Sequence, residues 1–83
     1  MYLGDLEKGE KAVVDGFKEE LLELTRLRDM GLSDGTFFKV VKFAPFGDSI
    51  EIKIRGSYLF LRRSTADCIK VRRIEEEHQI EES

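Results

Sequence analysis

The chain has 83 residues, of which 41% are hydrophobic and 37% are charged, and its formal net charge is −3. A chain of this length forms one domain with a thin core, so we expect no large buried active site. Its longest apolar run, Tyr58 to Leu61, is far shorter than the ~18 residues of a membrane span, and the single cysteine, Cys68, cannot form an internal disulfide. The first residues lack the basic and apolar regions of a signal peptide, so we expect a cytoplasmic protein.

The acidic charge is concentrated in the last nine residues. Five glutamates lie there, and residues 1–74 then carry 12 acidic against 14 basic residues, a net charge of +2. So acidic a segment cannot bury enough apolar surface to order itself. We therefore expect a folded domain over residues 1–74 and a flexible acidic tail over residues 75–83. The basic residues crowd the second half, which could face an anionic surface: Lys53, Arg55, Arg62, Arg63, Lys70, Arg72 and Arg73.

The first half of the chain predicts one strand and one helix. Residues 11–17 form the strand, and the helix begins at about Lys18, with acidic residues in its first turn where the helix dipole favours them. At helical spacing Phe17, Leu21, Leu24 and Leu27 lie on one arc, which predicts a core-facing stripe. Leu22 lies outside that arc. The glycine of Met30-Gly31-Leu32 predicts the end of the helix, because glycine readily adopts the left-handed conformation.

Two further strands, Phe37–Phe43 and Ser49–Arg55, flank a short loop. The first is rich in aromatic and β-branched residues, and the second alternates apolar with charged residues, which indicates one solvent-facing side. In the loop Ala44–Asp48, proline second and glycine fourth are typical of a type I turn. Gly56-Ser57 predicts a tight hairpin turn into a strand over residues 58–62.

The last predicted elements are one helical turn and a fifth strand. Ser64 with Asp67 three residues later resembles a capping pattern, and residues 69–73 form the strand. Five short strands cannot form a sandwich of ordinary size, whereas a small closed barrel hides their edges. We therefore predict a mostly β fold, a five-stranded barrel with one short helix after the first strand.

These elements and their spacing resemble the FeoA family, the small partner proteins of bacterial ferrous iron transport. The similarity covers roughly the whole chain up to Ile74. It rests on these pieces, in this order: Lys8-Gly9-Glu10-Lys11-Ala12-Val13-Val14, Met30-Gly31-Leu32, Gly35-Thr36, Ala44-Pro45-Phe46-Gly47-Asp48, and Leu61-Arg62 followed by Ala66. The resemblance implies a Src-homology-3-like (SH3-like) barrel, a domain that also recurs at the end of metal-dependent repressors.

Candidates for catalysis and for metal binding are few. The single histidine, His78, lies in the tail, so no Ser-His-Asp or Cys-His arrangement can form on the domain. Glu75, Glu77 and His78 could hold a divalent ion loosely, but a flexible ligand set loses entropy when it orders. Cys68 fits a small core residue better than a ligand. We expect no enzyme activity and no bound cofactor.

The candidate docking residues are Phe46 with its neighbours Pro45 and Gly47, then Asp48, Leu22 and the pair Arg62-Arg63. A phenylalanine in a turn is either packed on the barrel wall or exposed as an anchor for a partner. Asp48 could cap the loop through backbone N–H groups or present its charge. The arginine pair is either a solubilising surface or an anionic contact, and Leu22 is either a singly exposed leucine or a partner contact.

By resemblance, the chain would be a non-enzymatic accessory protein that docks on the GTPase-bearing part of the FeoB membrane transporter, at the inner face of the cell membrane. A metal-responsive regulatory domain is one alternative, but it needs a ligand cluster that the sequence does not show. A nucleic-acid-binding barrel is the other, and the alternation of Tyr58 and Phe60 with leucines, together with the acidic net charge, argues against it. The sequence leaves self-association and the sign of any effect on GTP hydrolysis open.

Overall fold

The computed structural model describes residues 1–18 and 22–74, with only the backbone at positions 22 and 23. Its elements are, in order, the 3-10 helix η1 (Leu3–Asp5), β1 (Lys11–Phe17), α1 (Leu22–Asp29), β2 (Phe37–Phe43), β3 (Ser49–Ile54), β4 (Ser57–Arg62), α2 (Arg63–Ala66) and β5 (Ile69–Ile74). The predicted tail, residues 75–83, lies outside the described residues, as does Leu21 of the predicted helical stripe.

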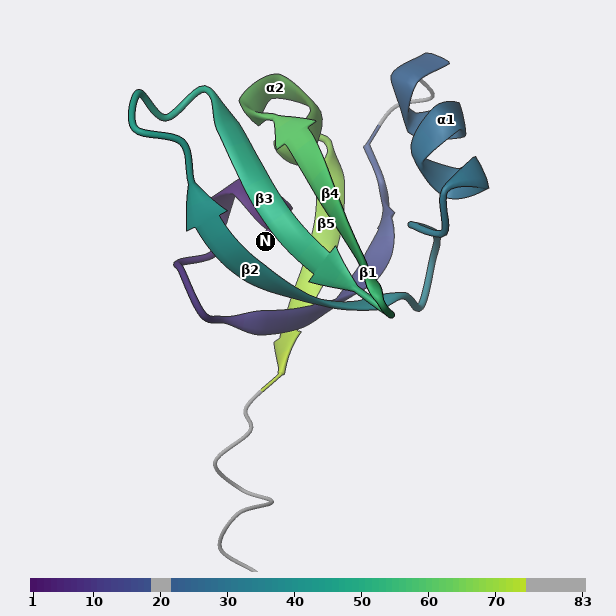
Figure 1. Ribbon diagram of the computed structural model, residues 1–83. Helices are drawn as coiled ribbons and strands as arrows, with labels where there is room; N and C mark the ends of the chain where they lie inside the picture. Colours follow the sequence, from purple (N-terminus) through teal and green to yellow (C-terminus); the bar gives the residue numbers. More distant parts are fainter. Residues whose placement is uncertain (19–21, 75–83) are drawn as a thin grey trace, which may run out of the picture.

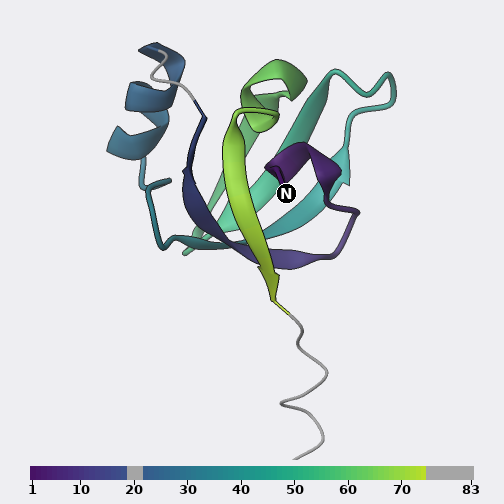
Figure 2. The same cartoon turned by 180° about the vertical axis from the view of Figure 1, so that it is seen from behind.

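The five strands form one antiparallel sheet in the order β4-β3-β2-β1-β5. The sheet curls back on itself, as the two opposite views show (Figures 1 and 2), and it encloses one hydrophobic core. Both α2 and η1 pack at the opening between the outer strands β4 and β5. This is the mostly β, SH3-like fold that the sequence predicts.

One part of the barrel prediction is wrong. Among the described residues β4 is hydrogen-bonded only to β3, so no ladder between β4 and β5 closes the sheet. The outer edge of β5 is covered by the N-terminal segment, because Tyr2 bridges Lys70 and the Val71 N–H donates to the Met1 carbonyl at 2.9 Å. Unpaired edges attract other strands, and this contact protects one of the two.

The core consists of residues that alternate along the strands with exposed ones. In β3 the three isoleucines at positions 50, 52 and 54 are buried, as are Leu59 and Leu61 opposite them in β4. The predicted register of this hairpin is therefore confirmed. The full set of buried apolar residues is Leu3, Leu6, Ala12, Val14, Leu24, Leu27, Leu32, Phe38, Val40, Ile50, Ile52, Ile54, Leu59, Leu61, Ala66, Ile69 and Val71.

The end of α1 is as predicted, and residues 19–21, on which its predicted first turn falls, lie outside the described residues. Gly31 has a φ of +106°, its N–H donates to the Arg28 carbonyl, and the Leu32 N–H donates to the Leu27 carbonyl at 2.9 Å, the Schellman pattern. Phe17, however, does not belong to the helical stripe. It is the last residue of β1, paired with Ile69, and the next N–H, that of Lys18, donates to the Cys68 carbonyl.

Two predicted features are also displaced, the hairpin turn by one residue and the start of the second helix by two. The loop between β3 and β4 is Arg55-Gly56, not Gly56-Ser57, because Ile54 pairs with Ser57; Gly56 supplies the left-handed φ of +66° as the second loop residue. The helix α2 begins at Arg63, so Ser64 lies inside it and is not its cap. No side chain caps its first turn.

Candidate functional site

The loop between β2 and β3 presents one large aromatic side chain to solvent. The Gly47 N–H donates to the Ala44 carbonyl at 2.9 Å, which closes the predicted turn around Pro45 and Phe46. A second bond, from the Ala44 N–H to the Ser49 carbonyl, closes the loop at its base. The Phe46 side chain is 92% exposed. The structure therefore shows Phe46 exposed to solvent and not packed on the barrel wall.

Asp48 ties the loop to the next part of the chain through its backbone. Its carbonyl accepts a hydrogen bond from the Arg63 N–H at 3.0 Å. The side chain of Asp48 is exposed and has no hydrogen-bond partner among the described residues, so the predicted capping of the loop is not seen. Its charge is free to meet a partner.

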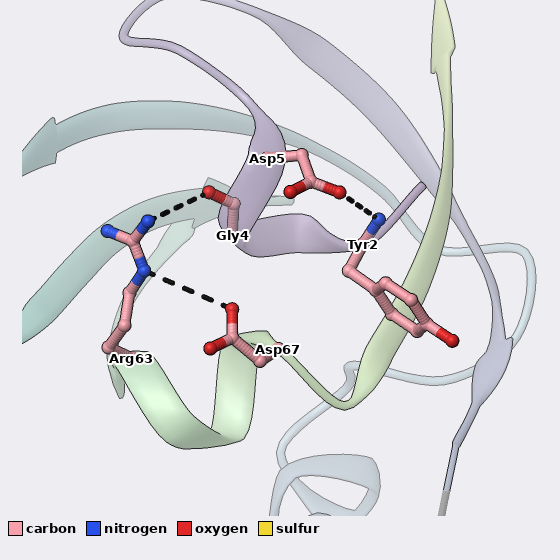
Figure 3. A network of polar contacts seen from close by, with 5 residues as sticks. All are labelled: Tyr2, Gly4, Asp5, Arg63 and Asp67. Atoms are coloured by element: carbon pink, nitrogen blue, oxygen red, sulfur yellow. Dashed lines mark hydrogen bonds and ion pairs between the residues drawn. The ribbon is translucent and has the colours of Figure 1, made fainter.

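The arginine pair splits into two different environments. Arg62 is exposed on the outer side of β4, directly across from Ser49, and so lies at the same end of the sheet as the loop. Arg63 points back onto the molecule, where its Nη2 donates to the Gly4 carbonyl at 3.2 Å and its Nε lies 3.9 Å from Asp67 Oδ1 (Figure 3). Its guanidinium is also 5.9 Å from the centre of the Phe43 ring.

Arg63 therefore holds η1 against α2, across 59 positions of sequence. We expect Arg63→Ala to lower the free energy of unfolding by about 1 kcal/mol, the usual net value of one such hydrogen bond. The matched change Arg62→Ala should alter it by less than about 0.5 kcal/mol, as is usual for an exposed side chain. Urea denaturation of the two variants measures both values. Equal losses would show that the contacts of Arg63 with Gly4 and Phe43 do not contribute.

Leu22 does not join this surface. It is the first residue of α1, and the loop of Phe46 and α1 lie on opposite sides of the molecule in both views (Figures 1 and 2). Its side chain lies outside the described residues.

The aromatic side chains of β4 were not identified from the sequence as docking residues. Phe60 is 67% exposed and Tyr58 is 54% exposed, both on the same outer side as Arg62. Beside them, a groove between β4 and α1 is also lined by Arg26, Met30 and Thr65. The hydroxyl of Thr65 is buried and has no hydrogen-bond partner among the described residues. The signal in the sequence was the alternation of these aromatic residues with leucines in β4, which predicts that the aromatic side chains face outward.

Residues 1–18 and 22–74 contain no group of three His, Cys, Asp or Glu side chains close enough to hold a metal ion. Cys68 is half-buried and packs against the core, as predicted. The candidate ligands Glu75, Glu77 and His78 lie outside the described residues. In the described part of the chain, no helix has the length and the apolar composition that crossing a bilayer would require.

The sequence model of the FeoA domain matches residues 1–73. The chain belongs to the FeoA family. The FeoA protein of Chlorobium tepidum is similar at 39% identity and a TM-score of 0.85, over 90% of this chain and 71% of that one. Iron(II) transport protein A of Clostridium thermocellum is 31% identical, with a TM-score of 0.82, over 89% of this chain and 46% of that one.

A third FeoA-family structure is that of Stenotrophomonas maltophilia FeoA in complex with zinc, described as an SH3 domain protein. It is 25% identical, with a TM-score of 0.73, over 87% of this chain and 89% of that one. A manganese-dependent transcriptional repressor and ScaR with bound Cd²⁺ also match, each at 18% identity, which shows a shared fold alone. No match is found among the curated proteins.

Proposed function

We propose that this FeoA-family chain is a non-enzymatic accessory protein of bacterial ferrous iron uptake. It docks on the cytoplasmic, GTPase-bearing part of the FeoB transporter, at the inner face of the cell membrane, and modulates the nucleotide cycle or the gating of the transporter. Family membership supports the link to iron transport, since a relative at 31% identity is an iron(II) transport protein.

The observation that carries the docking proposal is the exposure of Phe46. An aromatic side chain that is 92% exposed in a closed turn contributes nothing to the core, whereas aromatic residues are enriched among those that dominate binding energy. Proline at position 45 and the hydrogen bond from Gly47 to Ala44 restrict the loop before any partner arrives. A preorganised anchor loses little conformational entropy on binding.

The neighbouring charges suit a polar rim around such an anchor. Arg62 and Asp48 are both exposed, and the β3 to β4 register places Arg62 next to the base of the loop. Charges at the rim of an interface affect orientation and association rate more than affinity. The loop therefore supplies the anchor, and these two side chains supply the orientation.

The regulatory alternative has less support. The fold is shared with metal-dependent repressors, but the part of the chain that the structure describes brings no set of metal ligands together. A sensor that responds to a metal needs ligands converging from fixed positions.

The test of the docking proposal is Phe46→Ala. We expect it to weaken binding to the isolated GTPase domain of the transporter by at least ~1 kcal/mol, about fivefold in Kd, and to leave the melting temperature of the free protein almost unchanged. Isothermal titration calorimetry and a thermal melt measure the two values on the same sample.

Phe37→Ala is the matched control, because Phe37 is another exposed phenylalanine, at the opposite end of β2 from the loop. It should leave the affinity unchanged. Unaltered affinity in Phe46→Ala would exclude the loop as the anchor, and attention would then move to Phe60 and Arg62 on β4.

A further inference from the structure

The outer side of β2, β3 and β4 carries a basic and aromatic surface at the end away from Phe46. These three strands are neighbours in the sheet (Figure 1). Lys39 of β2 lies opposite Lys53 of β3, and Lys53 lies opposite Tyr58 of β4. All three side chains are exposed. One level of the sheet thus presents two lysines and a tyrosine side by side to solvent.

Two neighbouring hollows extend this surface. Lys8 lines the first, together with both lysines and the tyrosine. Phe37, two residues before Lys39, lines the second with Arg55, the residue that follows β3. Phe37 is 51% exposed and Tyr58 is 54% exposed. We call the residues of this surface the basic face: Lys8, Phe37, Lys39, Lys53, Arg55 and Tyr58.

The positive charge of the basic face is not neutralised within the part of the chain that the structure describes. None of its four cations makes an ion pair there. Glu51, on the same side of β3, pairs with Lys42 at 4.0 Å, and Asp34 alone is acidic among the residues that line the two hollows. Like charges directly opposite on neighbouring strands destabilise a sheet, so Lys39 and Lys53 are suited to an anionic occupant.

The aromatic rings among the cations distinguish between possible occupants, since cations alone would suit any polyanion. Aromatic side chains are enriched where a protein meets the boundary between lipid headgroups and acyl chains, and basic residues are attracted to anionic headgroups. A nucleic acid would instead stack its bases on the rings. Lys53 Nζ, however, lies over the Tyr58 ring, 5.6 Å from its centre, and covers one side of it. The face therefore suits an anionic bilayer better than a nucleic acid.

We propose that the basic face adsorbs to the anionic headgroups of a lipid bilayer, with Phe37 and Tyr58 at the level of the headgroups. Each basic residue near such a surface strengthens binding about fivefold, so four of them support reversible adsorption. The contact goes beyond the docking proposal, because it needs no transporter and lies at the opposite end of β2 and β3 from Phe46.

The fluorescence of a single tryptophan tests the inference. The chain contains no tryptophan, so Tyr58→Trp in the full chain places one reporter on the basic face. With vesicles of phosphatidylglycerol and phosphatidylcholine in equal parts, we expect its emission to shift to shorter wavelength as the ring leaves water. Vesicles of phosphatidylcholine alone should cause no shift. Raising the salt from about 0.01 M to about 0.15 M shortens the Debye length from about 30 Å to about 8 Å and should reduce the shift.

Tyr2→Trp is the matched control, because Tyr2 also lies beside lysines. It bridges Lys70 of β5, and Lys18 Nζ is 5.6 Å from the centre of its ring. In the sheet, β5 is separated from β3 by β2 and β1. The emission of Tyr2→Trp should not change with either kind of vesicle. An equal shift in the two variants would show that binding is not confined to the basic face, which would overturn the proposal.

Removal of two positive charges gives an independent readout, measured by sedimentation with the mixed vesicles. Lys39→Gln combined with Lys53→Gln should weaken binding about 25-fold. Lys18→Gln combined with Lys70→Gln removes the same charge beside Tyr2 and should leave binding nearly unchanged. Equal losses in the two double variants would assign binding to net charge and would contradict a defined face.

A thymidine oligonucleotide tests the other class of occupant. If it binds more tightly than the mixed vesicles, the face belongs to a nucleic acid and the lipid proposal is wrong. Absence of binding to the mixed vesicles would refute the proposal as well. These results are separate from those of the transporter experiment, because the vesicles hold no transporter and the titration of the GTPase domain contains no lipid.

Discussion

Ile52→Ala is expected to lower the free energy of unfolding by about 2 to 5 kcal/mol, the usual range for removing a large aliphatic side chain from a core. Ile52 is 0% exposed and lies in the middle of β3, paired with Val40 on one side and Leu59 on the other, both buried. Small domains have a total stability of about 5 to 15 kcal/mol, so this one change removes a large part of it. Urea denaturation gives the value directly.

Lys53→Ala is the control, one residue further along the same strand. Its side chain is exposed, so the change should shift the unfolding free energy by no more than about 0.5 kcal/mol. If Ile52→Ala lowers the unfolding free energy as little as Lys53→Ala does, the side of β3 that carries Ile52 is solvated. That result would contradict the register of the hairpin.

The alternation of β3 was readable in the sequence because it is a local property. Each isoleucine is separated from the next by one charged residue, and a period of two has only one structural meaning in a strand. The glycine that ends α1 and the turn of the Phe46 loop were predictable for the same reason. Both depend on the conformational preferences of glycine and proline within a few residues.

Phe17 shows where two local patterns compete: the predicted strand over residues 11–17 includes it correctly, whereas its place in the helical stripe is wrong. Its spacing to Leu21 and Leu24 fits a helix, but contacts distant in sequence decide its conformation: it pairs with Ile69, and the following N–H bonds to the Cys68 carbonyl. The small helix η1 was missed for a similar reason, since Leu3 enters the core and Arg63 bonds to Gly4 from the other end of the chain.

The candidate site was also predictable from the sequence only in part. The sequence identified the Phe46 loop as a feature but left the direction of its side chain open, because a turn residue can pack on the barrel or leave it. The alignment of Lys11, Lys39 and Lys53 across three strands was not visible at all, since it depends on the registers of those strands. Only the excess of basic residues was evident.

Removal of the buried hydroxyl of Thr65 is expected to have the second large effect on stability, opposite in sign to that of Ile52→Ala. Thr65 is 1% exposed, and its Oγ1 has no hydrogen-bond partner among the described residues. An unpaired buried polar group costs about 1 to 3 kcal/mol, and valine has nearly the shape of threonine without that group. Thr65→Val should therefore raise the free energy of unfolding by about 1 to 3 kcal/mol, measured by urea denaturation.

Thr65→Ser separates the hydroxyl from the methyl group. It keeps the polar group and removes one buried methyl, so it should lower stability by about 1 kcal/mol, opposite to the valine variant. If valine instead lowers stability, the hydroxyl is hydrogen-bonded in solution. If valine raises it, the hydroxyl costs the fold energy at a position that lines the groove between β4 and α1, beside Met30 and Phe60.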